Sequence, residues 1–346
     1  MLQTGIIFTH IVRVNKNIKI FINYFLGPVL FIWLAWSVYQ QIQGQPDIET
    51  VLVQIRKAFG SSKILLLLSV ILLMPVHWSL ETYKWMMAVR KVQVINFARA
   101  LKAILSGIAF SISTPNSIGE YVGRVLFMDD GNRIKAIALT VVANLSQLII
   151  TMLMGTVALF FLKDKLIQSD FLSEPMFYAT LSISIFILIT LTLIFFRLSL
   201  FIKIINKLPA TSKFAWAVEA VEHVNATLLV RFLSISVLRF VVFSLQYFLL
   251  FRFFGVDVSV VECWLGISVM FLVMAAIPTI ALFTDVGIKN ELSIKLIGIF
   301  SSNSLGISLT TLSVWFINLV FPAVVGSLII LGMKNIFKTK NEKKQD

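Results

Sequence analysis

Several ionisable residues of this chain lie in or beside otherwise apolar stretches, where they could form a polar site within a membrane. Glu120 and Arg124 follow a long uncharged run and are spaced to share one face of a helix. Arg239 stands inside an apolar run, and Lys289 and Glu291 follow another. A charge at the centre of a bilayer costs about 2.5–3.5 kcal/mol on insertion scales, so such residues are functional candidates. The arginine would attract an anionic headgroup or phosphate, whereas the carboxylates would hold cations or protons, or anchor the arginine.

Helix-breaking residues interrupt two of the apolar stretches. Thr-Pro-Asn-Ser at 114–117 and Ile-Pro-Thr at 277–279 both disfavour a continuous helix. Broken segments in the two halves of a membrane protein indicate a central site, because the freed backbone needs protein or water around it. The substrate-binding candidates are therefore the breaks and their neighbouring charges: Thr114, Pro115, Asn116, Gly119, Glu120, Arg124, Arg239, Pro278, Thr279 and Glu291, with Glu81 and Lys84 as secondary candidates.

Each charged candidate also has a purely structural interpretation. Glu81 and Lys84 lie near the end of an apolar run, where the lysine could extend to the membrane surface along its aliphatic stem. Arg239 could do the same. The pair at 120 and 124 could cap and flank a surface helix, and the pair at 289 and 291 could lie outside the hydrocarbon.

Polar but uncharged residues in the apolar runs have two interpretations as well. Asn144, Ser146 and Gln147 could line a site or simply hydrogen-bond between helices. His77 stands four residues before Glu81, so it could relay protons or only pack at an interface.

The composition is typical of a helical protein that crosses a membrane several times. Of 346 residues, 58% are hydrophobic and 14% are charged, and the mean hydropathy is +0.91. Lysines and arginines clustered between apolar runs explain the net charge of +13 better than nucleic-acid binding does. Cys263 is the single cysteine, which excludes an internal disulfide and a multi-cysteine metal site. Zinc-protease, Walker and dinucleotide patterns are absent, so we expect no metal and no cofactor.

The charge bias of the loops predicts an all-α polytopic fold. We expect about six transmembrane helices with both termini in the cytoplasm, and re-entrant broken hairpins at about 97–123 and 263–303 that enter from opposite faces as an inverted repeat. The predicted domains are a cytoplasmic N-terminal segment 1–19, a transmembrane domain 20–333 and a basic cytoplasmic tail 334–346. The predicted spans are approximately 20–39, 64–86, 136–162, 176–196, 232–254 and 306–332.

At the two breaks the sequence resembles the lysylphosphatidylglycerol synthase transmembrane-region family, also described as flippase-like integral membrane proteins. Residues 114–120 with Arg124 are similar to the family's Thr-Pro-Gly-x-x-Gly-Glu element, and 277–291 to its later proline-containing element that ends in glutamate. Arg239 with Gln246 resembles a further Arg and Gln pair on one helix, which adds Gln246 to the candidates. The sequence departs from the family pattern at two places, since asparagine replaces the glycine of the first element and Ala-Leu-Phe replaces a glycine run in the second.

The resemblance implies movement of a phospholipid or lipid-linked molecule between leaflets, in a bacterial plasma membrane. Family members fused to a soluble transferase add lysine to phosphatidylglycerol, but only a short basic tail follows the last span here, so we expect no enzyme activity. The expected partners are membrane lipids, above all anionic ones, and no nucleic acid; a homo-oligomer or an envelope-enzyme partner is compatible with the sequence. Alternatives are a non-transporting partner or scaffold of an envelope or lipid-modifying enzyme, small-molecule transport, and a membrane-embedded transferase with Glu120 or Glu291 as general base.

Overall fold

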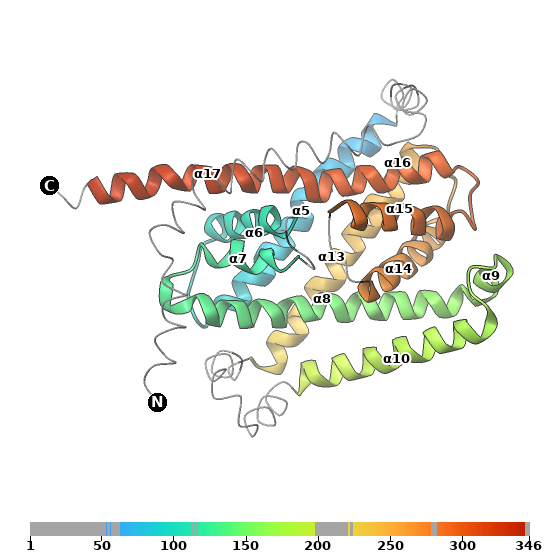
Figure 1. Cartoon of the computed structure of the whole chain (residues 1–346), viewed down its shortest axis with the longest axis horizontal. Coiled ribbons are helices and arrows are strands. Elements are labelled where there is room, and N and C mark those ends of the chain that lie inside the picture. The colour runs from blue at the N-terminus through green and yellow to red at the C-terminus, as the bar shows by residue number, and fades with distance from the viewer. Residues whose placement is uncertain are drawn as a thin grey trace.

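The protein is a bundle of helices (Figure 1). The computed structural model describes residues 53, 56, 63–112, 114, 117–197, 221, 224–277 and 282–342, with the backbone alone for 282–285 and 333–342. Within these ranges all regular structure is helical and no strand occurs. The all-α fold predicted from composition is therefore confirmed.

Five of the predicted spans appear as helices long and apolar enough to cross a membrane. The first predicted span, 20–39, and the N-terminal segment 1–19 lie outside the described residues, so the total of six stays a prediction. The last span is built from three consecutive pieces, the middle one a π-helical turn. The spans are α5 (Ile64–Val89), α8 with the preceding short helix (Asp130–Phe161), α10 (Glu174–Phe196), α13 (Ala226–Phe253) and Ser304–Gly332. The last of these consists of α16 (Ser304–Trp315), η5 (Phe316–Val320) and the first part of α17 (Phe321–Glu342).

Two pairs of shorter helices occupy the regions where hairpins were predicted. The first pair is α6 (Phe97–Ser111) with α7 (Gly119–Val125), and the second is α14 (Val260–Ala276) with α15 (Leu282–Ile297). None exceeds 17 residues, or about 25 Å at 1.5 Å per residue, which is less than the roughly 30 Å of a hydrocarbon core. Figure 1 shows the pairs towards opposite ends of α8 and α17, with their tips facing the middle. Their entry into a membrane from opposite faces stays a prediction.

Side-chain caps start three of these helices at defined residues. The Asn96 side chain accepts a hydrogen bond from the Arg99 backbone N–H at 2.8 Å and starts α6, and Asn225 does the same for α13. Ser259 and Glu262 form a reciprocal capping box at the start of α14. These caps satisfy N–H groups that a helix start otherwise leaves without a partner.

Glycines allow the first helix pair to pack tightly inside the bundle. A Cβ added at Gly123 of α7 would lie 2.5 Å from the Gly107 Cα of α6, so the two backbones are in direct contact. At the tip, the Gly119 N–H donates to the Thr114 Oγ1 at 2.7 Å, and a Cβ at Gly119 would lie 2.3 Å from the Phe110 carbonyl oxygen. This close packing fixes where the ionisable residues of α7 point.

Candidate functional site

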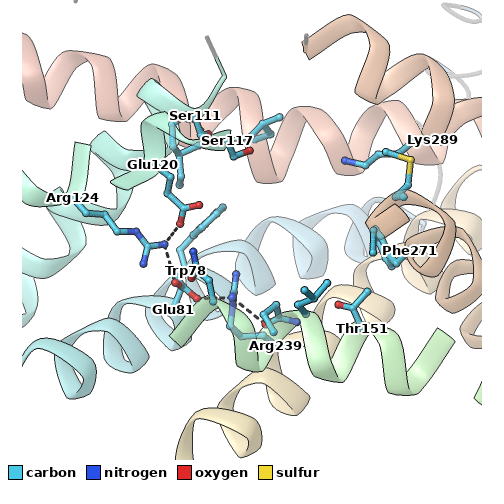
Figure 2. Close-up of a pocket in the computed structure, with 17 residues that line it drawn as sticks. Trp78, Glu81, Ser111, Ser117, Glu120, Arg124, Thr151, Arg239, Phe271 and Lys289 are labelled. Carbon is cyan, nitrogen blue, oxygen red and sulfur yellow. Dashed lines mark hydrogen bonds and ion pairs between the residues drawn. The ribbon is translucent and has the colours of Figure 1, made fainter. Parts of the chain in front are cut away.

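A cavity of about 480 Å³ lies between the tips of the two helix pairs. Its wall is made by both pairs together with α5, α8, α13 and η5, so segments far apart in the sequence meet there (Figure 2). The lining residues are Trp78, Glu81, Ile108, Ser111, Ser117, Glu120, Arg124, Asn144, Gln147, Leu148, Thr151, Arg239, Phe271, Met274, Ala275, Lys289 and Leu319.

Glu81 is the centre of the charged network on this wall. Its side chain accepts from Arg124 Nη2 at 2.8 Å and from Arg239 Nη1, and the Lys84 ammonium lies 3.0 Å from its Oε2. Glu81 is 1% exposed and Lys84 is fully buried. The lysine therefore does not extend to the surface, and the interfacial interpretation of this pair is wrong. Three helices, α5, α7 and α13, are joined by this one carboxylate.

Arg239 is held from three sides. Besides Glu81, it donates from Nη1 to Gln147 Oε1 at 3.1 Å, and its Nη2 lies 3.1 Å from His77 Nε2. All guanidinium nitrogens are donors, so His77 must accept through Nε2 and carry its proton on Nδ1. The guanidinium carbon also lies 6.0 Å from the centre of the Trp78 ring, within the range of a cation–π contact.

Arg124 retains donors that no described residue satisfies. The residue is 1% exposed, and its Nη2 donates to both Glu81 and Glu120. Its Nε and Nη1 have no hydrogen-bond partner among the described residues. Two carboxylates, Glu81 and Glu120, thus face three cations in the network, Lys84, Arg124 and Arg239, which leaves one excess positive charge. Buried cationic N–H groups favour an oxyanion as partner, because charge-assisted hydrogen bonds are strong where water is excluded.

The other predicted site residues divide between the cavity and its surroundings. Thr114 and Gly119 form the tip of the first helix pair and do not line the cavity. Gln246 is buried away from the cavity, where its Nε2 donates to the Val70 carbonyl oxygen at 3.2 Å. Glu291 is exposed on α15, whereas Lys289 lines the cavity. Four predicted residues lie outside the described part of the chain: Pro115, Asn116, Pro278 and Thr279.

Three hydroxyl residues of the wall were absent from the sequence-based set: Ser111, Ser117 and Thr151. Thr151 could have been found, because Asn144, Gln147 and Thr151 follow a spacing of three and four residues and share one face of α8. Ser117 has a φ of 56°, a left-handed backbone conformation that residues other than glycine rarely adopt. No sequence signal for that conformation was available.

The family described as the lysylphosphatidylglycerol synthase TM region matches residues 24–326 of the chain. The chain belongs to this family. All five described spans begin within the matched region, and every residue that lines the cavity lies inside it. This member of the lysylphosphatidylglycerol synthase TM region family is thus an integral membrane protein linked to lipid or envelope processes. No curated protein and no solved structure matches the chain.

Proposed function

We propose that the protein moves an anionic phospholipid between the leaflets of a membrane, with the headgroup passing through the cavity. The observation that supports this most directly is the buried network around Glu81. It carries one excess positive charge, and Arg124 keeps two guanidinium nitrogens without a partner among the described residues. A phosphate oxygen is the ligand that a guanidinium prefers.

The part of the cavity wall across from the Glu81 network is mostly apolar, although Lys289 and Thr151 also lie there (Figure 2), and its apolar surface favours a lipid over a free anion. Phe271, Met274 and Ala275 of α14 line it, and Leu148 of α8 and Leu319 of η5 add to its apolar surface. Figure 2 shows Phe271 well apart from the Glu81 network. A headgroup could pair with the cations while the first carbons of its acyl chains meet the apolar side. The chains themselves would stay in the surrounding lipid.

We infer further that both termini are cytoplasmic, in a bacterial plasma membrane. Arg90 and Lys91 follow α5, and the loop there contains no acid before α6 begins. Beyond the other end of α8, Lys163 and Lys165 are outnumbered by three acids, Asp164, Asp170 and Glu174. Cytoplasmic loops carry the excess of lysine and arginine, so the end of α5 belongs inside and the end of α8 outside.

The decisive experiment is exchange of labelled phosphatidylglycerol between leaflets of proteoliposomes. Wild type should exchange the lipid, and Arg239→Ala and Arg124→Ala should lose exchange, because each removes a cation from the cavity wall. Arg99→Ala is the matched control. Arg99 pairs with the exposed Asp129 outside the cavity, and its loss should leave exchange within about twofold of wild type.

The alternative is a partner or scaffold of an envelope enzyme that transports nothing. Folded wild type that exchanges neither phosphatidylglycerol nor a zwitterionic lipid would overturn the transport proposal and favour that alternative. Equal loss of exchange in Arg99→Ala and Arg239→Ala would also contradict it, because the cavity would then have no special part in the activity.

A further inference from the structure

The two carboxylates that hold Arg124 differ in how firmly they are fixed. Glu81 is enclosed by three cations, and its side chain is almost completely buried. The Glu120 side chain is 23% exposed, and the ion pair that involves it among the described residues is the one with Arg124. Both carboxylates contact the same atom, Arg124 Nη2 (Figure 2). One counter-ion of Arg124 is therefore built into the bundle, and the other stands at the open wall of the cavity.

We infer that Glu120 is an internal competitor for the anion site, a carboxylate that occupies Arg124 Nη2 until a phosphate group displaces it from that nitrogen. This inference rests on the proposed function and names the recognised chemistry, a phosphate oxyanion, whether on a lipid or free. Glu120 and Arg124 are one turn apart on α7, so the competitor is tethered and always close. The displaced carboxylate has room in the cavity, which both residues line.

A site with an internal competitor suits a transporter better than a site that holds its substrate tightly. Conduction requires a substrate to bind well enough to enter and weakly enough to leave. A phosphate that pairs with Arg124 Nη2 leaves Glu120 without its ion-pair partner, and the return of Glu120 to Nη2 removes that contact from the phosphate. Glu81 cannot exchange in this way, because its removal would leave Lys84, Arg124 and Arg239 without a shared counter-ion.

The size of the effect follows from the fraction of time that Arg124 is free. An apparent dissociation constant equals the intrinsic one divided by the competent fraction, so a pairing occupied about 90% of the time weakens anion binding about tenfold. Glu120→Gln keeps the shape of the side chain and removes its charge. At that occupancy it should bind phosphate about tenfold more tightly than wild type. Glu120→Asp, whose carboxylate reaches less far, should show a smaller gain.

The test is calorimetric binding of inorganic phosphate and of dihexanoyl phosphatidylglycerol to the purified full-length protein in detergent. Asp129→Asn is the control, since it neutralises an exposed carboxylate that pairs with Arg99 away from the cavity. We expect Glu120→Gln to bind both probes more tightly than wild type and the control to bind them as wild type does. A gain in affinity for both phosphate and the lipid, with the two competing for binding, would identify the phosphate group as the recognised element.

Other outcomes separate this inference from the proposed function. Wild type that binds and exchanges lipid, with Glu120→Gln binding no more tightly, would overturn the competitor role alone. If neither wild type nor Glu120→Gln binds phosphate or the lipid, the proposal that the cavity binds anions is overturned as well. A gain for phosphate without any lipid binding would keep the competitor role and contradict lipid transport. If Glu120→Gln does not fold, Glu120→Asp takes its place in the test. Phosphate binding by Glu120→Asp that is equal to or weaker than that of wild type overturns the inference.

Discussion

Replacing Glu81 by glutamine should destabilise the protein more than any other neutralisation of a single carboxylate in the described residues. The substitution preserves the shape of the side chain but leaves Lys84, Arg124 and Arg239 facing an uncharged amide. Removing one partner of a buried ion pair costs about 3–5 kcal/mol, because the remaining charge is uncompensated. Three cations share this partner, so we expect the free energy of unfolding to fall by about 4–5 kcal/mol, at the upper end of that range.

The single cysteine provides the assay. Cys263 is buried, so a thiol-reactive fluorophore labels it only when α14 comes away from the bundle. Labelling would be followed in mixed micelles as the fraction of denaturing detergent rises, and the shift of the midpoint compared between variants. Asp129→Asn is the matched control: its side chain is 68% exposed and pairs with Arg99 at 3.1 Å, and such exposed pairs contribute about 1 kcal/mol or less.

The result that would refute this reasoning is an equal shift for the two variants. Glu81 would then be solvated as Asp129 is, and the network would not be the enclosed structure described above. A large shift of the labelling midpoint for Asp129→Asn, with a small shift for Glu81→Gln, would contradict the reasoning more strongly.

Two further predictions concern packing and topology. Gly123→Ala should lower the free energy of unfolding by about 1–3 kcal/mol, because the added methyl group meets Gly107. Gly131→Ala, whose methyl group has nothing within 4 Å, should change it by less than about 0.5 kcal/mol. Thermal unfolding of both variants measures this difference, and equal melting temperatures would contradict the contact. In a Cys263→Ser background, Gly131→Cys should react with an impermeant maleimide only from the cytoplasmic side and Asp164→Cys only from outside. Labelling of both from one side would overturn the predicted topology.

Hydropathy predicted the long helices well, because a span needs only a run of apolar residues of sufficient length. The run predicted at 176–196 is the helix 174–196, and that at 232–254 is the helix 226–253. The ends were less accurate because caps decide them: the Asn225 cap starts α13 at Ala226, several residues before the apolar run. The breaks also located the two pairs of shorter helices, but the contact of Gly123 with Gly107 that packs the first pair depends on how the two helices cross, which the sequence pattern does not encode.

The central role of Glu81 could not be predicted in the same way. Its contacts with Arg124 and Arg239 join residues 43 and 158 positions apart, and no local pattern encodes such a pairing. Glu81 and Lys84 alone have the appearance of a polar helix end near the membrane surface. Only the packing of α7 and α13 against α5 turns them into the centre of the site.

Two placements could have been anticipated from helix geometry. Lys289 and Glu291 are two residues apart, about 200° around a helix, so only one of them can face a given cavity. Arg239 and Gln246 share a face of α13 but are separated by about 10 Å along its axis at 1.5 Å per residue. Gln246 consequently meets the backbone of α5 rather than the cavity.

The buried charge network is itself an argument for a binding role. Ion pairs in a protein interior often contribute no more stability than apolar residues of the same volume, because desolvation offsets their attraction. A bundle of apolar helices could therefore close the space around Glu81 without any charge. The network instead supplies more positive than negative charge and leaves Arg124 donors without a partner among the described residues, beside a cavity whose far wall is mostly apolar. An amphiphile with an anionic head satisfies both halves of that cavity at once, whereas a free anion or a neutral lipid satisfies only one.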